Sequence, residues 1–201
     1  MFEFFKSYPM KNNYEHHFDI TTILLHWGMA LAIFFLFGLG LYMVDLTYYD
    51  SWYKGSTALH KSIGLCVFML LVVRVIWRLK VILCSPPVRI KRGHRSLEQW
   101  LAVFVHMLLY VMVAFLCFSG YFIATAGGRE VEFFSLFSLP PLPVEIENQE
   151  DVAGSWHYYL GWGLISLAAL HALAALKHHF INHDNTLKNM LKPSKINNGD
   201  S

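Results

Sequence analysis

Four long runs of apolar residues dominate the pattern of hydrophobic and polar positions along the chain. Each run has roughly 20 or more mostly apolar residues, and a helix of that length, rising 1.5 Å per residue, crosses about 30 Å of hydrocarbon. Membrane-spanning β-strands need only about 10 residues, so runs of this length exclude a barrel. The pattern therefore predicts four transmembrane helices, at about 20–44, 58–79, 97–126 and 156–180.

Composition places the chain in the membrane class as well. Of its 201 residues, 55% are hydrophobic and only 15% are charged, whereas a soluble domain carries about 25% charged residues. The formal net charge of +2 gives no overall bias toward nucleic acid. We expect an all-α, integral membrane four-helix bundle whose surroundings are the lipid bilayer, with no nucleic-acid partner.

The charges of the predicted loops indicate an orientation. From Arg78, in the last turn of the second helix, to Arg95, just before the third, the chain has six basic residues and no acid, whereas the segment 127–155 has six acids against one arginine. Basic residues concentrate in cytoplasmic loops. We therefore expect cytoplasmic segments at 1–19 and 183–201, hence both termini inside, and an irregular, proline-containing periplasmic cap at 127–155. A polar N-terminus followed by so long an apolar run does not fit a cleavable signal peptide.

Four histidines lie inside the predicted helices or at their ends, at two depths. The predicted topology puts His26 and His171 near the cytoplasmic side and His60 and His157 near the periplasmic side. His157 and His171 are 14 residues apart on one helix, which is nearly four turns and about 21 Å, so both rings project from one face. Imidazoles are costly in hydrocarbon unless something binds them, so these four are candidate ligands.

Two ligands at each of two depths fit two haems, each with two axial histidines. A haem in a helix bundle takes its ligands from facing helices, and two imidazoles leave no open position on iron, which favours electron transfer. On geometry alone, His106 in the third helix lies near the depth of the inner pair and could replace either member. The three cysteines form no C-x-x-C-H motif, so covalent haem attachment is excluded.

Several polar residues are candidates for contacts with the haems or with a quinone. Arg74 and Arg78 could neutralise the propionates of the inner haem, and Lys61 those of the outer haem; the alternative is that these side chains reach the membrane interface. His178 and Lys177, at the inner end of the fourth helix, are candidate quinone contacts, and His106 is a candidate for a quinone or haem-edge hydrogen bond.

Seven short segments, taken as an ordered set, are typical of one protein family: Leu24–Trp27, Leu46–Tyr53, Leu59–Gly64, Val73–Arg78, Ser155–His157, Ala175–Phe180 and Asp184–Leu187. At these residues the sequence resembles the bacterial cytochrome b561 family, whose fold is shared with cytochrome b subunits of nickel–iron hydrogenases. The resemblance covers the transmembrane region, residues 20–182, as one four-helix di-haem cytochrome b domain. Within the family, the sequence is most similar to the subgroup whose genes neighbour a lipocalin-like periplasmic lipid-binding protein.

The resemblance implies two non-covalent haem b groups in a bacterial inner-membrane protein. It assigns the ligand roles to His26 with His171 (inner iron) and His60 with His157 (outer iron), and it argues against His106 as a ligand. It also implies electron transfer between a periplasmic-side donor, with superoxide as a candidate, and ubiquinone; whether the chain is itself an oxidoreductase is left open, as is any protein partner.

Two other functions fit the same sequence features. One is a haem-bearing membrane anchor subunit of a respiratory dehydrogenase, such as a hydrogenase or a formate dehydrogenase, which would copurify with a large metalloprotein subunit. The other is a transition-metal transporter, which predicts no haem absorbance and usually has discontinuous helices.

Overall fold

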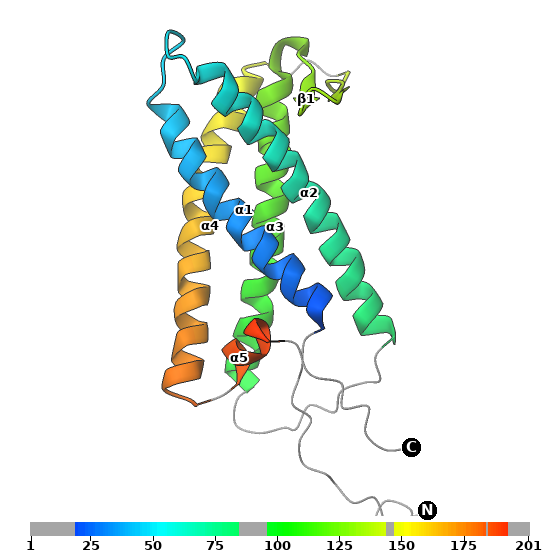
Figure 1. The fold of residues 1–201 in the computed structure, drawn as a ribbon, viewed down its shortest axis with the longest axis vertical. Coiled ribbons are helices and arrows are strands. Elements are labelled where there is room, and N and C mark those ends of the chain that lie inside the picture. The colour runs from blue at the N-terminus through cyan, green and yellow to red at the C-terminus, as the bar shows by residue number, and fades with distance from the viewer. Residues whose placement is uncertain (1–18, 85–95, 144–146, 184, 193–201) are drawn as a thin grey trace, which may run out of the picture.

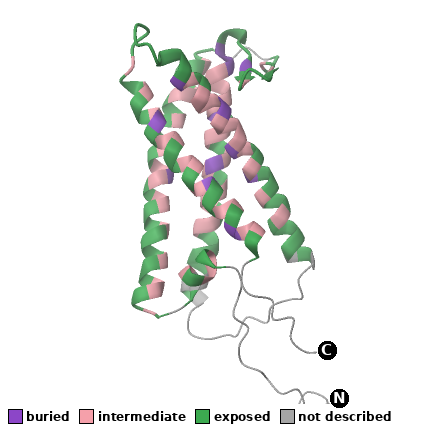
Figure 2. Ribbon diagram, viewed as in Figure 1, coloured by how far each residue is buried: buried purple, intermediate pink, exposed green. Residues whose placement is uncertain are grey.

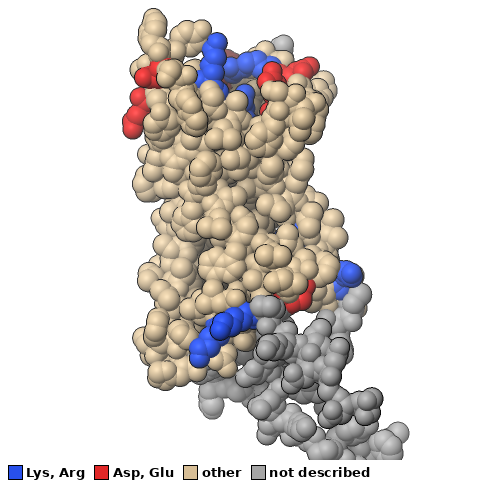
Figure 3. Space-filling view, in the orientation of Figure 1, with Lys and Arg blue, Asp and Glu red and all other residues tan. Residues whose placement is uncertain are grey.

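Four long helices run up and down in the computed structural model, which describes residues 19–84, 96–143, 147–183 and 185–192 (Figure 1). All four are long and apolar enough to cross a membrane, so the chain is a multi-pass integral membrane protein. On the face drawn in Figure 3, charged side chains gather at the two ends of the bundle and leave an uncharged girdle between them. The helices are α1 (Ile20–Val44), α2 (Tyr53–Cys84), α3 (Ser96–Thr125) and α4 (Gln149–Phe180).

The first helix has the predicted bounds, but α2 and α4 begin earlier than their apolar runs. In α2, five residues (Tyr53 to Thr57) precede position 58, and α4 begins seven residues before the predicted 156. The first turn of α4 carries Glu150 and Asp151, and acids there interact favourably with the positive end of the helix dipole. The first turns of α2 and α4 lie at the end of the bundle, where polar residues are tolerated. The start of each helix therefore cannot be recognised from hydrophobicity alone.

The expected irregular cap contains regular structure. A short 3₁₀ turn (η1, Ala126–Gly128) leads into a two-stranded antiparallel hairpin of β1 (Val131–Phe133) and β2 (Phe137–Leu139). The cap is therefore shorter and more ordered than expected. Its hairpin lies at the upper end of the bundle in Figure 1, which we call the hairpin end.

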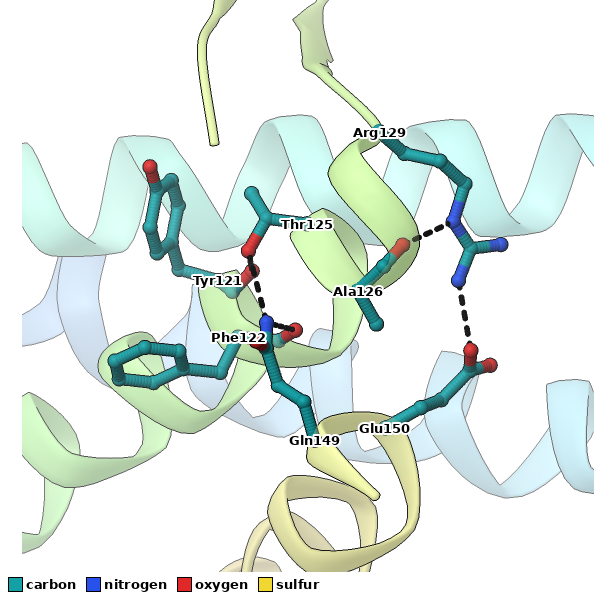
Figure 4. Close-up of polar contacts among 7 residues, drawn as sticks. All are labelled: Tyr121, Phe122, Thr125, Ala126, Arg129, Gln149 and Glu150. Atoms are coloured by element: carbon teal, nitrogen blue, oxygen red, sulfur yellow. Dashed lines mark hydrogen bonds and ion pairs between the residues drawn. The ribbon is translucent and has the colours of Figure 1, made fainter. Parts of the chain in front are cut away.

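Hydrogen bonds fasten this cap to the ends of the helices. The backbone N–H of Phe134 in the hairpin turn donates to Ser62 Oγ of α2 at 3.0 Å. Gln149, the first residue of α4, donates through Nε2 to the Phe122 carbonyl of α3 at 2.8 Å, and Arg129 pairs with Glu150 at 2.8 Å (Figure 4). The start of α4 is thus held against the end of α3, which fixes the height of α4 in the bundle.

The helices pack mainly in chain order, α1 on α2, α2 on α3, and α3 on α4, while α1 and α4 touch over a shorter stretch. Burial is concentrated along the bundle axis and the outer faces are exposed (Figure 2), as expected where lipid covers them. The buried core lies at mid-height and consists of Met29, Val67, Leu71, Val113 and Leu164.

A short helix, α5 (Thr186–Leu191), follows α4 and packs beside it. Trp27 of α1 donates through Nε1 to the Met190 carbonyl of α5 at 2.9 Å. This contact closes the bundle at the end opposite the hairpin, which we call the α5 end.

Candidate haem-binding site

Two pairs of histidine rings face each other between helices, at two heights. Toward the hairpin end, His60 of α2 and His157 of α4 have ring centres 6.1 Å apart. Toward the α5 end, His26 of α1 and His171 of α4 have ring centres 6.4 Å apart. The four histidines expected to pair thus meet two by two, with α4 contributing one ring to each pair.

Both separations fit an iron held between two imidazoles. Imidazole nitrogens bind metal ions at about 2 Å, and a ring centre lies about 1.1 Å behind its nitrogen, so two axial rings on one iron have centres about 6 Å apart. His106 and His171 have ring centres only 4.9 Å apart, which leaves less room than an iron between two rings needs. The residues present therefore fit two bis-histidine haem sites.

The second nitrogen of each ring meets different surroundings. His157 Nδ1 lies 3.0 Å from Ser119 Oγ of α3, and Arg74 of α2 donates through Nη2 to His26 Nδ1 at 2.9 Å. His60 Nδ1 is buried and has no hydrogen-bond partner among the described residues. Buried polar atoms normally have a partner; His179 Nδ1 is also buried without one among the described residues, so this feature alone does not identify a ligand.

Two glycines let the rings at the hairpin end approach neighbouring helices. A Cβ at position 120 of α3 would lie 3.2 Å from His157 Cε1, and one at position 40 of α1 would lie 3.5 Å from His60 Cε1. Gly38, Gly64 and Gly161, which lie near the ligands in the sequence, have no such neighbour within 4 Å. Of these five glycines, Gly40 and Gly120 are thus the two that lie against a candidate ligand.

The candidate propionate contacts differ in burial and in their contacts. Arg74 is half-buried; besides His26, it donates through Nε to Tyr110 Oη of α3 at 2.9 Å and lies over the Tyr110 ring. Arg78 is exposed and Lys61 is half-buried. Arg74 therefore points into the bundle at the α5 end rather than to the membrane interface.

The candidate quinone contacts lie at the same end. His106 Nδ1 donates to the Ala102 carbonyl of its own helix at 2.6 Å, so the ring presents Nε2 to its surroundings. His178 Nδ1 lies 3.1 Å from Asn182 Nδ2, and Lys177 is exposed in the last turn of α4.

The structure adds Ser119 and Tyr110 to the site, and sequence patterns alone do not identify either one. Both lie on α3, one beside His157 and the other beside Arg74. The available signal is small: Ser119 precedes Gly120 in the apolar second half of α3, and a small polar residue there is typical of an ordinary helix–helix contact.

Comparison with known proteins agrees with this arrangement. The sequence pattern described as prokaryotic cytochrome b561 matches residues 17–193. Cytochrome b561 homolog 2 of Escherichia coli (strain K12) is 37% identical over 187 residues, which are 93% of this chain and 97% of that protein. The probable superoxide oxidase CybB of Yersinia pestis is 28% identical over 143 residues, 71% of this chain and 77% of that protein.

Membership of such a family implies b-type haem, electron transport and a place in the bacterial inner membrane. The four apolar helices agree with the membrane location, and the paired interior histidines agree with b-type haem. This chain belongs to the prokaryotic cytochrome b561 family.

Proposed function

We propose that this protein is a di-haem b cytochrome that carries electrons across the inner membrane between a periplasmic donor and the quinone pool. The observation that supports the proposal most directly is the pair of ring separations, 6.1 Å for His60 and His157 and 6.4 Å for His26 and His171. Each pair would hold one haem through both axial positions. The haem supplies one-electron chemistry as its iron alternates between the ferric and ferrous states.

The chain's own residues separate and insulate the two sites. His157 and His171 lie 14 residues apart on α4, which is about 21 Å along the helix. Leu164 lies midway between them and belongs to the buried apolar core. This core excludes water between the two levels, so an electron has to pass from one site to the other through the protein.

Arg74 serves the haem at the α5 end. An arginine only donates hydrogen bonds, so its contact with His26 Nδ1 requires that nitrogen to be unprotonated. A neutral imidazole that gives Nε2 to iron carries its proton on Nδ1, and Arg74 then has to turn to another acceptor. The positively charged Arg74 guanidinium then needs an anionic partner inside the bundle, and a haem propionate would supply one.

Ubiquinone is the acceptor we propose at the α5 end, which the loop charges orient toward the cytoplasm. A quinone carbonyl accepts hydrogen bonds, and His106 of α3 and His178 and Lys177 of α4 are polar side chains in the part of these helices nearest that end. Reduction of one quinone takes two electrons and two protons, so the chain has to turn over twice for each quinol formed.

Superoxide is the donor we propose at the hairpin end, where it would lose one electron and become dioxygen. The Yersinia pestis relative is named a probable superoxide oxidase. Lys54 and Lys61, near the start of α2, supply positive charge that attracts an anion against the acids of the cap.

Haem quantification in histidine variants tests the ligand assignment. We expect two haem b per wild-type chain and the loss of one haem when any of the four paired histidines is changed to alanine. His106→Ala should retain both haems, and His183→Ala, at an exposed position beyond α4, is the matched control. Fewer than two haems in the wild type, or full haem content in His157→Ala, would refute the assignment.

Stopped-flow spectroscopy then tests the donor and acceptor. Superoxide should reduce the oxidised protein, superoxide dismutase should abolish this reduction, and a soluble ubiquinone analogue should reoxidise the protein. His178→Ala should slow only the reoxidation. Copurification with a large metalloprotein subunit, together with no reaction with superoxide, would favour an anchor subunit instead.

A further inference from the structure

Ser119 of α3 lies between the candidate ligand His157 and the backbone of its own helix. Its hydroxyl donates to the Leu116 carbonyl at 3.0 Å, and the same oxygen lies 3.0 Å from His157 Nδ1. The ring can come this close because position 120, next to the serine, is a glycine.

Coordination of an iron through Nε2 would decide the direction of these hydrogen bonds. A ligating nitrogen has to be unprotonated and a neutral imidazole has only one N–H, so Nδ1 of a ligating His157 carries the ring proton and donates to Ser119 Oγ. A serine hydroxyl has one proton and two lone pairs, so the Ser119 oxygen can accept from His157 while its own proton goes to the Leu116 carbonyl.

We propose that Ser119 is a positioning residue that holds His157 in its ligating tautomer and orientation and makes this ring a stronger electron donor to iron. The inference rests on the proposed function, since it assumes that His157 binds haem. Outer partners that accept a proton from a ligating histidine raise its basicity. A more basic ligand favours the ferric state, so Ser119 lowers the midpoint potential of the haem at the hairpin end.

The two rings of this pair differ in a way that makes the effect specific. His60 Nδ1 is buried without a partner among the described residues, so only the His157 side of the iron receives this support. At the α5 end, His26 Nδ1 meets a donor, Arg74, and not an acceptor. We therefore expect a change at Ser119 to shift one of the two potentials and leave the other unchanged.

The test is a spectroelectrochemical titration of the purified, haem-loaded protein with three variants. Ser119→Ala removes the acceptor, and Ser119→Thr keeps a hydroxyl at the same place. Ser56→Ala is the matched control, because Ser56 is a buried serine of α2 whose hydroxyl donates to the carbonyl three residues earlier, at 3.1 Å. Haem release to a scavenging apoprotein gives a second readout that does not depend on turnover.

Ser119→Ala should raise one midpoint potential, by up to about 59 mV if ferric binding weakens tenfold relative to ferrous binding. It should also weaken haem binding at the hairpin end about 10-fold. Ser119→Thr and Ser56→Ala should behave like the wild type.

Unchanged potentials in Ser119→Ala, an equal shift in Ser56→Ala, or a failure of Ser119→Thr to keep the wild-type potential would each overturn the inference. Failure of the proposed function gives a different result: the wild-type protein itself would contain fewer than two haems, and this would be seen before any serine variant is compared.

Discussion

Replacing Gly120 by alanine tests how closely the bundle fits the His157 ring. The new Cβ would lie 3.2 Å from His157 Cε1 and 3.5 Å from Nδ1, so the ring has to move by a few tenths of an ångström. Displacing a side chain from its preferred rotamer costs about 0.5–1.5 kcal/mol. Because each 1.4 kcal/mol is a factor of ten in affinity, we expect haem binding at the hairpin end to weaken about 2- to 12-fold.

Two other glycines of the bundle provide a graded comparison. A Cβ at position 40 would lie at an ordinary contact distance, 3.5 Å, from His60 Cε1, and one at position 38 would meet nothing within 4 Å. Gly40→Ala should therefore have a smaller effect than Gly120→Ala, and Gly38→Ala should have none. Alanine also favours a helix by up to about 1 kcal/mol over glycine, but this gain is common to the haem-free and haem-bound forms and cancels in the affinity.

The assay is haem content per chain, followed by the rate of haem loss to a scavenging apoprotein. The order of haem-loss rates should be Gly120→Ala, then Gly40→Ala, then Gly38→Ala, with the last equal to the wild type. A wild-type rate in Gly120→Ala would show that the ring does not depend on this close approach. Equal losses in all three variants would show that helix rigidity, and not the ring contact, controls haem binding.

Two further predictions concern polar side chains at the two ends of the bundle. Arg74→Ala should weaken haem binding at the α5 end about 12- to 140-fold, because a hydrogen bond to a charged group is worth about 1.5–3 kcal/mol. The exposed Arg78→Ala should change haem binding little, and equal haem content in the two variants would contradict the propionate role. Arg129→Ala should change the thermal stability of the detergent-solubilised protein by less than about 1 kcal/mol, because the Arg129 and Glu150 side chains are 59% and 60% exposed. Gln149→Ala should cost about 0.5–1.5 kcal/mol, because it removes the bond to the Phe122 carbonyl, and a larger loss in Arg129→Ala than in Gln149→Ala would contradict this ranking.

The membrane-spanning part of the fold could be predicted from the sequence because the lipid environment makes hydrophobicity and length decisive there. The apolar run of α1 lies between Asp19 and Asp45, and the helix has the predicted bounds. The early starts of α2 and α4 could not be predicted in this way, since their first turns lie where polar residues are tolerated. The hairpin was missed because strands of three residues are too short to show an alternating pattern.

Helix spacing and loop charges give the depth of each histidine, but depth alone left His106 as an alternative to either inner ring, and only the family resemblance argued against it. What the sequence could not give is the set of contacts between helices. Ser119 and Tyr110 acquire their roles only through the rotation of α3 about its axis, which brings one beside His157 and the other beside Arg74. Spacing along one helix does not specify that rotation relative to the neighbouring helices.

Because one continuous helix carries a ring of both pairs, the length of α4 between positions 157 and 171 is constrained. Inserting or deleting a single residue there turns one ring by about 100° relative to the other and takes it away from its partner helix. Length changes close to a whole number of turns keep both rings on one face, but they move the two levels apart or together and leave α1 and α2 out of step. Evolution or design can therefore exchange one apolar residue for another on the lipid-facing surface of α4, whereas the spacing between its two histidines can change only together with the other helices.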